Sequence, residues 1–134
     1  MVEDKNVKEI NIAIFNGKII RRKFVDNRWF FSVVDIIGVL TDSSKPRDYW
    51  YRLKQRELEF SNVQLSIFCR RLKLKSGDNK EYETDCSDTE GIFRIIQSIS
   101  SKKAEPFKRW LARVGYERIQ EIENPELAQD RMWR

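Results

Sequence analysis

Alternating apolar and polar residues near the start of the chain predict a small antiparallel sheet. The runs expected to form its strands are Ile10–Phe15, Lys18–Val25 and Arg28–Phe31. Asn16-Gly17 and Asp26-Asn27 separate these runs, and both dipeptides favour tight two-residue turns. The second turn places Phe24 opposite Trp29 on the neighbouring strand. We therefore expect a three-stranded meander that follows a flexible segment at residues 1–9.

A second alternating stretch predicts a β-hairpin in the middle of the chain. Its turn is expected at Gly77-Asp78-Asn79, which sets the register of the two strands. The expected cross-strand partners are Arg71 with Asp85, Leu72 with Thr84, Lys73 with Glu83, Leu74 with Tyr82 and Lys75 with Glu81. The hairpin therefore neutralises much of its own charge. In the same register Cys69 and Cys86 point to opposite faces, which argues against a disulfide.

The other periodic stretches repeat every three to four residues and predict helices. Helices are expected over Val33–Leu40, Lys45–Glu59, Val63–Cys69, Ser87 to Ile99, Phe107 to Val114, Tyr116–Glu123 and from Pro125 onward. The expected caps are Ser32 with Asp35, Ser43 or Ser44, Ser87 with Glu90, and Asn124. Pro106 fits a helix that begins just before it, and Gly115 is expected to end or bend that helix.

The helix expected over Lys45–Glu59 has two distinct faces at 100° per residue. One face gathers apolar residues that we expect in the core, namely Tyr49, Trp50, Leu53 and Phe60. The other is a basic stripe of Arg47, Tyr51 and Lys54, with Arg52 and Arg56 on its flank. Asp48 lies one turn before Arg52 and is expected to pair with it, which leaves Arg47 and Lys54 without a local partner. These two are the cations freest to meet an anion, and a solvated outer face of an ordinary helix is the alternative.

Together these elements predict an α+β fold, with a small antiparallel β-meander plus a β-hairpin packed against several α-helices. The 134 residues, of which 40% are hydrophobic and 12% aromatic, suit a single domain, expected over residues 10–134. The helical pattern is interrupted at Arg134, so we expect the chain to be the N-terminal part of a longer protein. No apolar run reaches the roughly 20 residues of a membrane span, and a signal peptide is missing at the first residues. A cytoplasmic protein without membrane contact is therefore expected.

Charge and chemistry favour binding over catalysis. Lys and Arg number 26 against 21 Asp and Glu, and the net charge of +5, concentrated between Lys18 and Arg113, suits an anionic partner. Histidine is absent, and the two cysteines lack metal-ligand spacing, so the commonest general base and most zinc sites are excluded. A metal-dependent nuclease would use Asp85, Asp88 and Glu90. Capping and cross-strand roles already account for these three residues, so we expect no enzyme, no catalytic residue, no metal and no cofactor.

Much of the chain resembles a known family. The resemblance covers about residues 12–132 and is carried by the runs IFNGKIIR, NRWFFSVVDIIGVLTDSSKPRDYWYRLKQRE and TDCSDTEGIFRIIQSISSKKAEPFKRWLARVGYERIQEIENPELAQ. These runs are similar to the BRO N-terminal domain of phage and viral antirepressor-type proteins, and within that group most similar to the bacterial DNA-damage-inducible protein D. The family positions are Trp29-Phe30, Asp35, Leu40, Trp50, Leu53, Glu90-Gly91, Ala104, Phe107 and Trp110. Most of them are core or capping positions, so the resemblance supports the fold more than it locates a site.

The resemblance implies a DNA-binding, non-catalytic module of regulatory or DNA-damage-response proteins of the SOS response or of prophages, usually joined to a variable C-terminal domain. The residues expected to contact DNA, duplex or single-stranded, are Arg47, Tyr51, Arg52, Lys54, Arg56, Arg21, Arg22, Lys23, Arg70, Lys102, Lys103, Lys108 and Arg109. Most contacts would reach phosphates and confer little sequence preference. The alternative is a protein-interaction module that captures a repressor or a DNA-repair protein, and homo-oligomerisation stays open.

Overall fold

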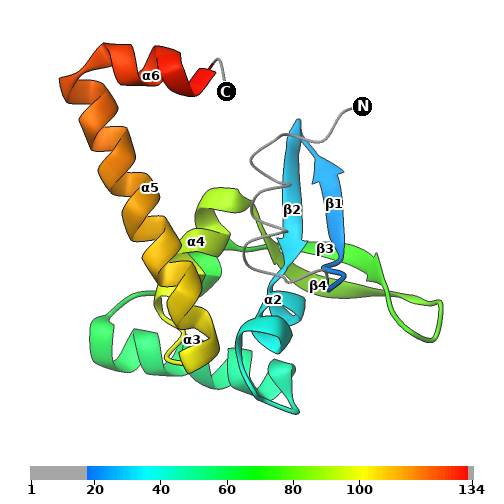
Figure 1. The fold of residues 1–134 in the computed structure, drawn as a ribbon. Coiled ribbons are helices and arrows are strands. Elements are labelled where there is room, and N and C mark those ends of the chain that lie inside the picture. Colours follow the sequence, from blue (N-terminus) through cyan, green and yellow to red (C-terminus); the bar gives the residue numbers. More distant parts are fainter. Residues whose placement is uncertain (1–17, 133–134) are drawn as a thin grey trace. The chain divides into compact units, whose positions relative to one another are not determined.

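The computed structural model describes residues 18–132, and Figure 1 shows the arrangement of their helices and strands. The strand expected at Ile10–Phe15, the turn at Asn16-Gly17 and the flexible segment at residues 1–9 lie outside the described residues. The fold is α+β, as predicted. The chain divides into two units, of which the first ends at Ala104 and the second begins at Glu105. The expectation that residues 10–134 fold as a single domain stays a prediction.

One antiparallel sheet of four strands forms the centre of the first unit. Its strands are β1 (Arg22–Val25), β2 (Arg28–Ser32), β3 (Arg70–Lys75) and β4 (Glu81–Ser87), in the spatial order β1-β2-β4-β3. The five predicted pairs of the β3–β4 hairpin are all present. Phe31 and Ser32 of β2 pair with Ser87 and Cys86 of β4, so the hairpin belongs to the same sheet as β1 and β2. The strand expected from Lys18 is shorter than predicted, because β1 begins only at Arg22.

The turn between β1 and β2 follows the prediction. Asp26 and Asn27 have φ angles of 51° and 65°, the left-handed conformation that a type I′ turn requires at both central positions. This turn brings Phe24 opposite Trp29, with ring centroids 5.2 Å apart in an edge-to-face arrangement. The dipeptide therefore determines the register of the first hairpin.

The helices of the first unit pack against the sheet and against one another. They are α2 (Val33–Leu40), α3 (Pro46–Ser61), the 3₁₀ helix η1 (Leu65–Phe68), α4 (Thr89–Gln97) and the 3₁₀ helix η2 (Lys102–Ala104). α2 begins and ends where the sequence predicts, with Ser32 accepting a hydrogen bond from the backbone N–H of Asp35. The helix expected over Val63–Cys69 is shorter and tighter than predicted. Figure 1 shows the turn end of the β3–β4 hairpin projecting away from these helices.

Two predicted caps are wrong. α3 begins after Lys45 without a side-chain cap, because the hydroxyl of Ser43 accepts a hydrogen bond from the backbone N–H of Lys45 and closes a local turn instead. α4 is capped by Asp88, which accepts a hydrogen bond from the backbone N–H of Gly91 at 2.9 Å. Ser87 is buried and donates to the backbone carbonyl of Phe68, so it belongs to the core rather than to a capping box. α4 also ends at Gln97, two residues before the expected Ile99.

The core of the first unit is formed mainly by α2, α3 and α4. Its buried aliphatic and aromatic side chains include Val33, Ile36, Ile37, Leu40, Trp50, Leu53, Leu65, Ile92, Ile95, Ile96 and Ile99. The prediction that Phe60 joins them is wrong, since its side chain is 79% exposed. Phe60 lies seven residues beyond Leu53, or about 10 Å along the helix axis, so it keeps the direction of the core face but extends past it.

The second unit consists of α5 (Glu105–Glu123) and α6 (Pro125–Met132), joined at Asn124. α5 continues through Gly115, so the predicted break or bend at this glycine is wrong. Pro106 is the second residue of α5, where a helix needs no backbone donor, and Asn124 accepts a hydrogen bond from the backbone N–H of Glu126, as its predicted cap role requires. Within residues 18–132, no helix combines the length and apolar character required to cross a bilayer.

Candidate nucleic-acid interface

A cleft of about 520 Å³ lies between α3 and the β3–β4 hairpin. We call it the α3–hairpin cleft, and its lining residues are Val34, Arg47, Trp50, Lys54, Arg71, Tyr82, Glu83, Thr84 and Asp85. Arg47 and Lys54 are the two cations that the sequence singled out on α3, and the structure places both in this cleft. The hairpin adds a third cation, Arg71, so the basic stripe of α3 continues onto the sheet.

The carboxylate of Asp85 contacts three of the polar side chains that line the cleft. Its carboxylate accepts a hydrogen bond from the indole Nε1 of Trp50 at 2.8 Å and one from Lys54 Nζ at 3.4 Å. The guanidinium of Arg71 lies 3.9 Å from the other carboxylate oxygen. Lys54 Nζ also lies 5.0 Å from the centroid of the Trp50 ring, within cation–π range. Lys54 therefore has a partner 31 residues away in sequence, and the expectation that it lacks one holds only for its own helix.

Arg47 is exposed and differs from the other cations of the cleft in having no hydrogen bond or ion pair with any described residue. It lies close enough to Tyr82 for its positive charge to lower the pKa of the phenol. The hydrogen bond that Tyr82 donates to Asp78 outweighs this effect and raises the pKa of Tyr82 overall. Tyr82 thus offers a half-exposed aromatic ring near the Arg47 guanidinium.

Three further predicted residues of α3 do not line the α3–hairpin cleft, namely Tyr51, Arg52 and Arg56. Tyr51 is 60% exposed, and its hydroxyl accepts a hydrogen bond from Gln55. Arg52 and Arg56 line a second depression of about 330 Å³ with Tyr49 and Leu53. Arg52 donates to the backbone carbonyl of Asp48 at 3.4 Å, and the described residues contain no ion pair between the two side chains, so that predicted pair is wrong. Arg56 donates to the backbone carbonyl of Ser98 at 2.7 Å.

The basic residues around β1 have internal partners. Arg21 holds Asp35 with its Nε and Nη2 atoms at 2.8 and 2.9 Å and donates to the backbone carbonyl of Lys75. Its hydrogen bond to Asp35 is the main reason why the pKa of Arg21 is raised. Arg22 lies over the ring of Trp29 at 4.2 Å, and Lys23 donates to the backbone carbonyl of Lys73 at 3.4 Å. Asp35 therefore forms an ion pair in addition to the predicted stabilisation of the start of α2.

Comparison with known families matches residues 20–122 to the N-terminal domain of the BRO family. The chain belongs to this family. The BRO N-terminal domain is a DNA-binding domain of phage antirepressor-like proteins. No curated protein and no solved structure matches the chain. The match spans nearly the whole described chain, and it agrees with the family resemblance of the sequence.

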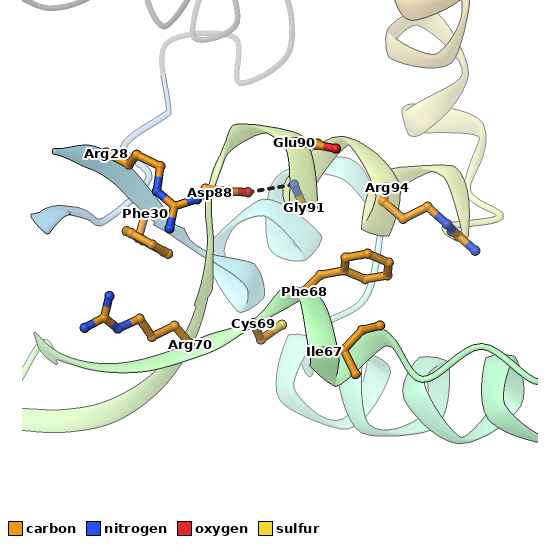
Figure 2. Close-up of a pocket in the computed structure, with 10 residues that line it drawn as sticks. All are labelled: Arg28, Phe30, Ile67, Phe68, Cys69, Arg70, Asp88, Glu90, Gly91 and Arg94. Carbon is orange, nitrogen blue, oxygen red and sulfur yellow. Dashed lines mark hydrogen bonds and ion pairs between the residues drawn. The ribbon is translucent and has the colours of Figure 1, made fainter. Parts of the chain in front are cut away.

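The same BRO domain carries a second cleft of about 520 Å³, shown in Figure 2. It is lined by Arg28, Phe30, Ile67, Phe68, Cys69, Arg70, Asp88, Glu90, Gly91 and Arg94. The guanidiniums of Arg28 and Arg70 lie on either side of the Phe30 ring, at 5.3 and 5.7 Å from its centroid (Figure 2). Each of these arginines pairs with a carboxylate, Arg28 with Asp88 and Arg70 with Asp26. Two of the three arginines of this cleft thus have closer carboxylate contacts than Lys54 and Arg71 have with Asp85, and the third, Arg94, donates to the Ser98 hydroxyl, so we favour the α3–hairpin cleft for phosphate.

The remaining candidates of the BRO domain are spread over η2 and the second unit. Lys102 is exposed on η2, and Lys103 pairs with Asp42 at 2.8 Å. Lys108 and Arg109 lie on α5, where Arg109 approaches Glu105 at 4.0 Å. Among the predicted residues, Arg47 and Lys54 line the α3–hairpin cleft together, and Arg52 and Arg56 line a depression of their own.

The acidic residues considered for a nuclease have structural partners. Asp85 binds Trp50 and Lys54, and Asp88 caps α4 and pairs with Arg28. Residues 18–132 contain no group of three or more His, Cys, Asp or Glu side chains placed to hold a metal ion. Cys69 and Cys86 are both free thiols, as predicted from their register. Burial is the main reason why the pKa of Cys69 is raised to about 12 and that of Cys86 to about 11.

The sequence did not single out Arg71 and Tyr82, which the structure places in the lining of the α3–hairpin cleft. The predicted register places Arg71 opposite Asp85 and is correct, but it led to the conclusion that the hairpin neutralises this cation. In the structure Asp85 is shared with Trp50 and Lys54, and the Arg71 side chain stays 68% exposed. The packing of α3 against the hairpin decides this outcome, and no local pattern of residues encodes it.

Proposed function

We propose that the α3–hairpin cleft is the surface through which this BRO domain binds DNA. The observation that carries the proposal is the convergence of Arg47, Lys54 and Arg71 on one cleft, with Arg47 unpaired among the described residues. Guanidinium and ammonium groups gathered in one cleft suit the phosphates of a nucleic-acid backbone, which a protein contacts without regard to sequence. Tyr82 exposes an aromatic ring in the cleft, and Tyr51 exposes one a helical turn from Arg47 and Lys54, so each can pack against a sugar or base.

Other basic residues of the chain supply secondary phosphate contacts outside the α3–hairpin cleft. We assign this role to Arg22, Lys23, Arg52, Arg56, Lys102, Lys103, Lys108 and Arg109. Arg21 and Arg70 contribute mainly to the fold, because their guanidiniums already bind Asp35 and Asp26. Contacts at the edge of an interface change the salt dependence and the association rate more than the final affinity.

We propose that DNA binding by this domain serves a regulatory role and involves no catalysis. Membership of a family of phage antirepressor-like proteins supports a regulator that acts by occupying DNA. A part in the bacterial response to DNA damage is supported by the resemblance of the sequence to DNA-damage-inducible protein D. Both roles need only reversible binding, and a cytoplasmic location follows from either.

The proposal is tested by fluorescence anisotropy with labelled duplex DNA of random sequence. The double variant Arg47→Ala with Lys54→Ala is expected to bind about tenfold to hundredfold more weakly, because two charge-assisted phosphate contacts are lost. Its melting temperature should stay close to that of the wild type, since neither side chain belongs to the buried core. Labelled single-stranded DNA of the same length, measured in parallel, gives the preferred strand form.

The matched control is Lys18→Ala with Arg113→Ala, which removes the same charge from two exposed positions outside the cleft. This control should weaken binding by less than about threefold through the general field of the protein. Equal losses in the two double variants would show that net charge, and not the α3–hairpin cleft, governs binding. Unchanged affinity in the Arg47 and Lys54 variant would overturn the assignment.

Capture of a repressor or a DNA-repair protein is the second candidate function. It is favoured by three large apolar side chains that are exposed on consecutive elements, Leu58 and Phe60 at the end of α3 and Ile67 on η1. An apolar contact of this kind responds little to salt, whereas phosphate binding weakens steeply. Phe60→Ser should therefore impair protein capture while leaving DNA affinity unchanged.

A further inference from the structure

The second unit exposes an apolar stripe along α5. The stripe consists of Leu111, Gly115, Ile119 and Ile122, which follow one another at the spacing of one helical face. Ile119 is 57% exposed and Ile122 is 69% exposed, although both are aliphatic residues in the middle of a long helix. A helix of 19 residues that leaves such side chains in water gains stability when another apolar helix covers them.

Neither the backbone of α5 nor a neighbouring atom requires a glycine at position 115. A glycine inside a helix is less favourable than alanine by about 1 kcal/mol. A Cβ atom added at Gly115 would meet no atom within 4 Å, and the residue lies inside regular α-helix. A second helix crossing the stripe at this point would use the missing side chain, because small residues let two helix backbones approach closely.

The other side of the second unit is already occupied. The buried carboxylate of Glu121 forms ion pairs with Arg118 at 3.1 Å and with Arg131 of α6 at 2.6 Å. The second ion pair connects α6 to α5. Glu121 lies about 100° around the helix from Ile122. The apolar stripe is therefore a face of α5 that α6 leaves open, with Ile119 and Ile122 exposed and Leu111 partly exposed.

The charges of α5 are arranged unequally along its length. In the first half Lys108, Arg109 and Arg113 outnumber the single carboxylate of Glu105. In the second half Glu117, Glu121 and Glu123 outnumber the single cation of Arg118. Two parallel copies of this helix would set like charges side by side, whereas two antiparallel copies set the basic half against the acidic half.

We propose that α5 forms an antiparallel pair with α5 of a second copy of this chain, crossing at Gly115. In this arrangement Ile119 packs beside Leu111 of the partner subunit, and Lys108 lies beside Glu123 of the partner subunit. Such a dimer contains two DNA-binding units. When one unit is bound, the effective concentration of the second unit at the DNA is raised. The proposal does not rest on the assignment of the DNA surface, because self-association is measured without DNA.

The first test is the molar mass of the chain by light scattering after gel filtration, over a range of concentrations. We expect the mass of two chains at high concentration for the wild type and the mass of one chain for Ile119→Lys with Ile122→Lys. The matched control is Tyr116→Lys with Met132→Lys, which alters two equally exposed apolar residues outside the stripe and should leave the dimer intact. Circular dichroism confirms that each variant keeps its helices.

The second test separates an antiparallel pair from other arrangements. Lys108→Glu or Glu123→Lys alone should weaken dimerisation by about twofold to thirtyfold, because each substitution affects two equivalent ion pairs. The two substitutions together should restore it, and 15 residues of helix, about 22 Å, prevent a direct interaction between them within one chain. A mass of one chain at all concentrations, a dimer that survives the Ile119 and Ile122 variant, or a failure of the double charge exchange to restore dimerisation would overturn the proposal.

Discussion

A single carboxylate, Asp85, determines how much positive charge the α3–hairpin cleft presents. It lies within 3.4 Å of Lys54 Nζ and 3.9 Å of the Arg71 guanidinium, and it also accepts the indole hydrogen of Trp50. A phosphate that enters the cleft has to compete with this carboxylate for both cations. Asp85 therefore positions the basic side chains of the cleft, and under the proposed function it also limits the affinity for phosphate.

Asp85→Asn is expected to raise DNA affinity by about threefold to tenfold, because one negative charge leaves the cleft while the amide oxygen still accepts the Trp50 hydrogen bond. Anisotropy with random duplex DNA measures the change. Glu81→Gln, which removes the same charge from an exposed position of the same strand, serves as the control and should have a smaller effect. A loss of affinity in Asp85→Asn, with the fold intact, would show that the carboxylate helps binding rather than limits it.

The two thiols are expected to react slowly in the folded protein. Burial raises the pKa of Cys69 to about 12 and that of Cys86 to about 11, above the ordinary 9.0, so folding favours the protonated thiol. This contribution to stability is present below pH 9 and is lost as the pH rises toward the folded values. At pH 8 a thiol reagent should modify the native protein at least tenfold more slowly than the urea-unfolded protein. Equal rates would contradict the burial of Cys86 and the partial burial of Cys69.

At the scale of the elements, patterns within a few residues predict most of the fold, and errors occur where two local options compete. The hairpin register and the bounds of α2 follow from turn chemistry and apolar periodicity, and both are confirmed. The start of α4 is displaced by one residue because Ser87 is required in the core, which leaves the capping role to Asp88. Helix propensity also carries α5 through Gly115, since a single glycine weakens a helix without ending it.

The corrected cap of α4 leads to a contrast between two neighbouring carboxylates. Asp88→Ala should lower the free energy of unfolding by about 1 kcal/mol or more, because it removes the cap hydrogen bond to Gly91 and the pair with Arg28. Glu90→Ala, at the exposed position that the predicted capping box would have used, should change it by less than about 0.5 kcal/mol. Urea unfolding followed by circular dichroism measures both. A larger loss of unfolding free energy in Glu90→Ala than in Asp88→Ala would show that Glu90 stabilises the start of α4, as the predicted capping box requires.

At the scale of the whole molecule, the α3–hairpin cleft exists because α3 and the β3–β4 hairpin meet. The sequence identifies Arg47 and Lys54 from their helical spacing, and the structure confirms that they share a face. It does not reveal that Asp85, 31 residues beyond Lys54, lies against the same helix, nor that Arg71 extends the site onto the sheet. Contacts between distant segments depend on packing that no local period encodes, so the positions of cations along the chain are predictable and their partners are not.

The salt dependence of DNA binding tests the central claim most directly. The affinity of the wild-type chain for random duplex DNA is measured by anisotropy from low to near-physiological salt and plotted on logarithmic axes. Contacts by Arg47, Lys54 and Arg71 with separate phosphates predict a slope that becomes shallower by about 0.9 for each of these residues replaced by alanine. A slope that stays the same in all three alanine variants, or affinity that does not change with salt, would contradict the account of a phosphate-binding cleft between α3 and the hairpin.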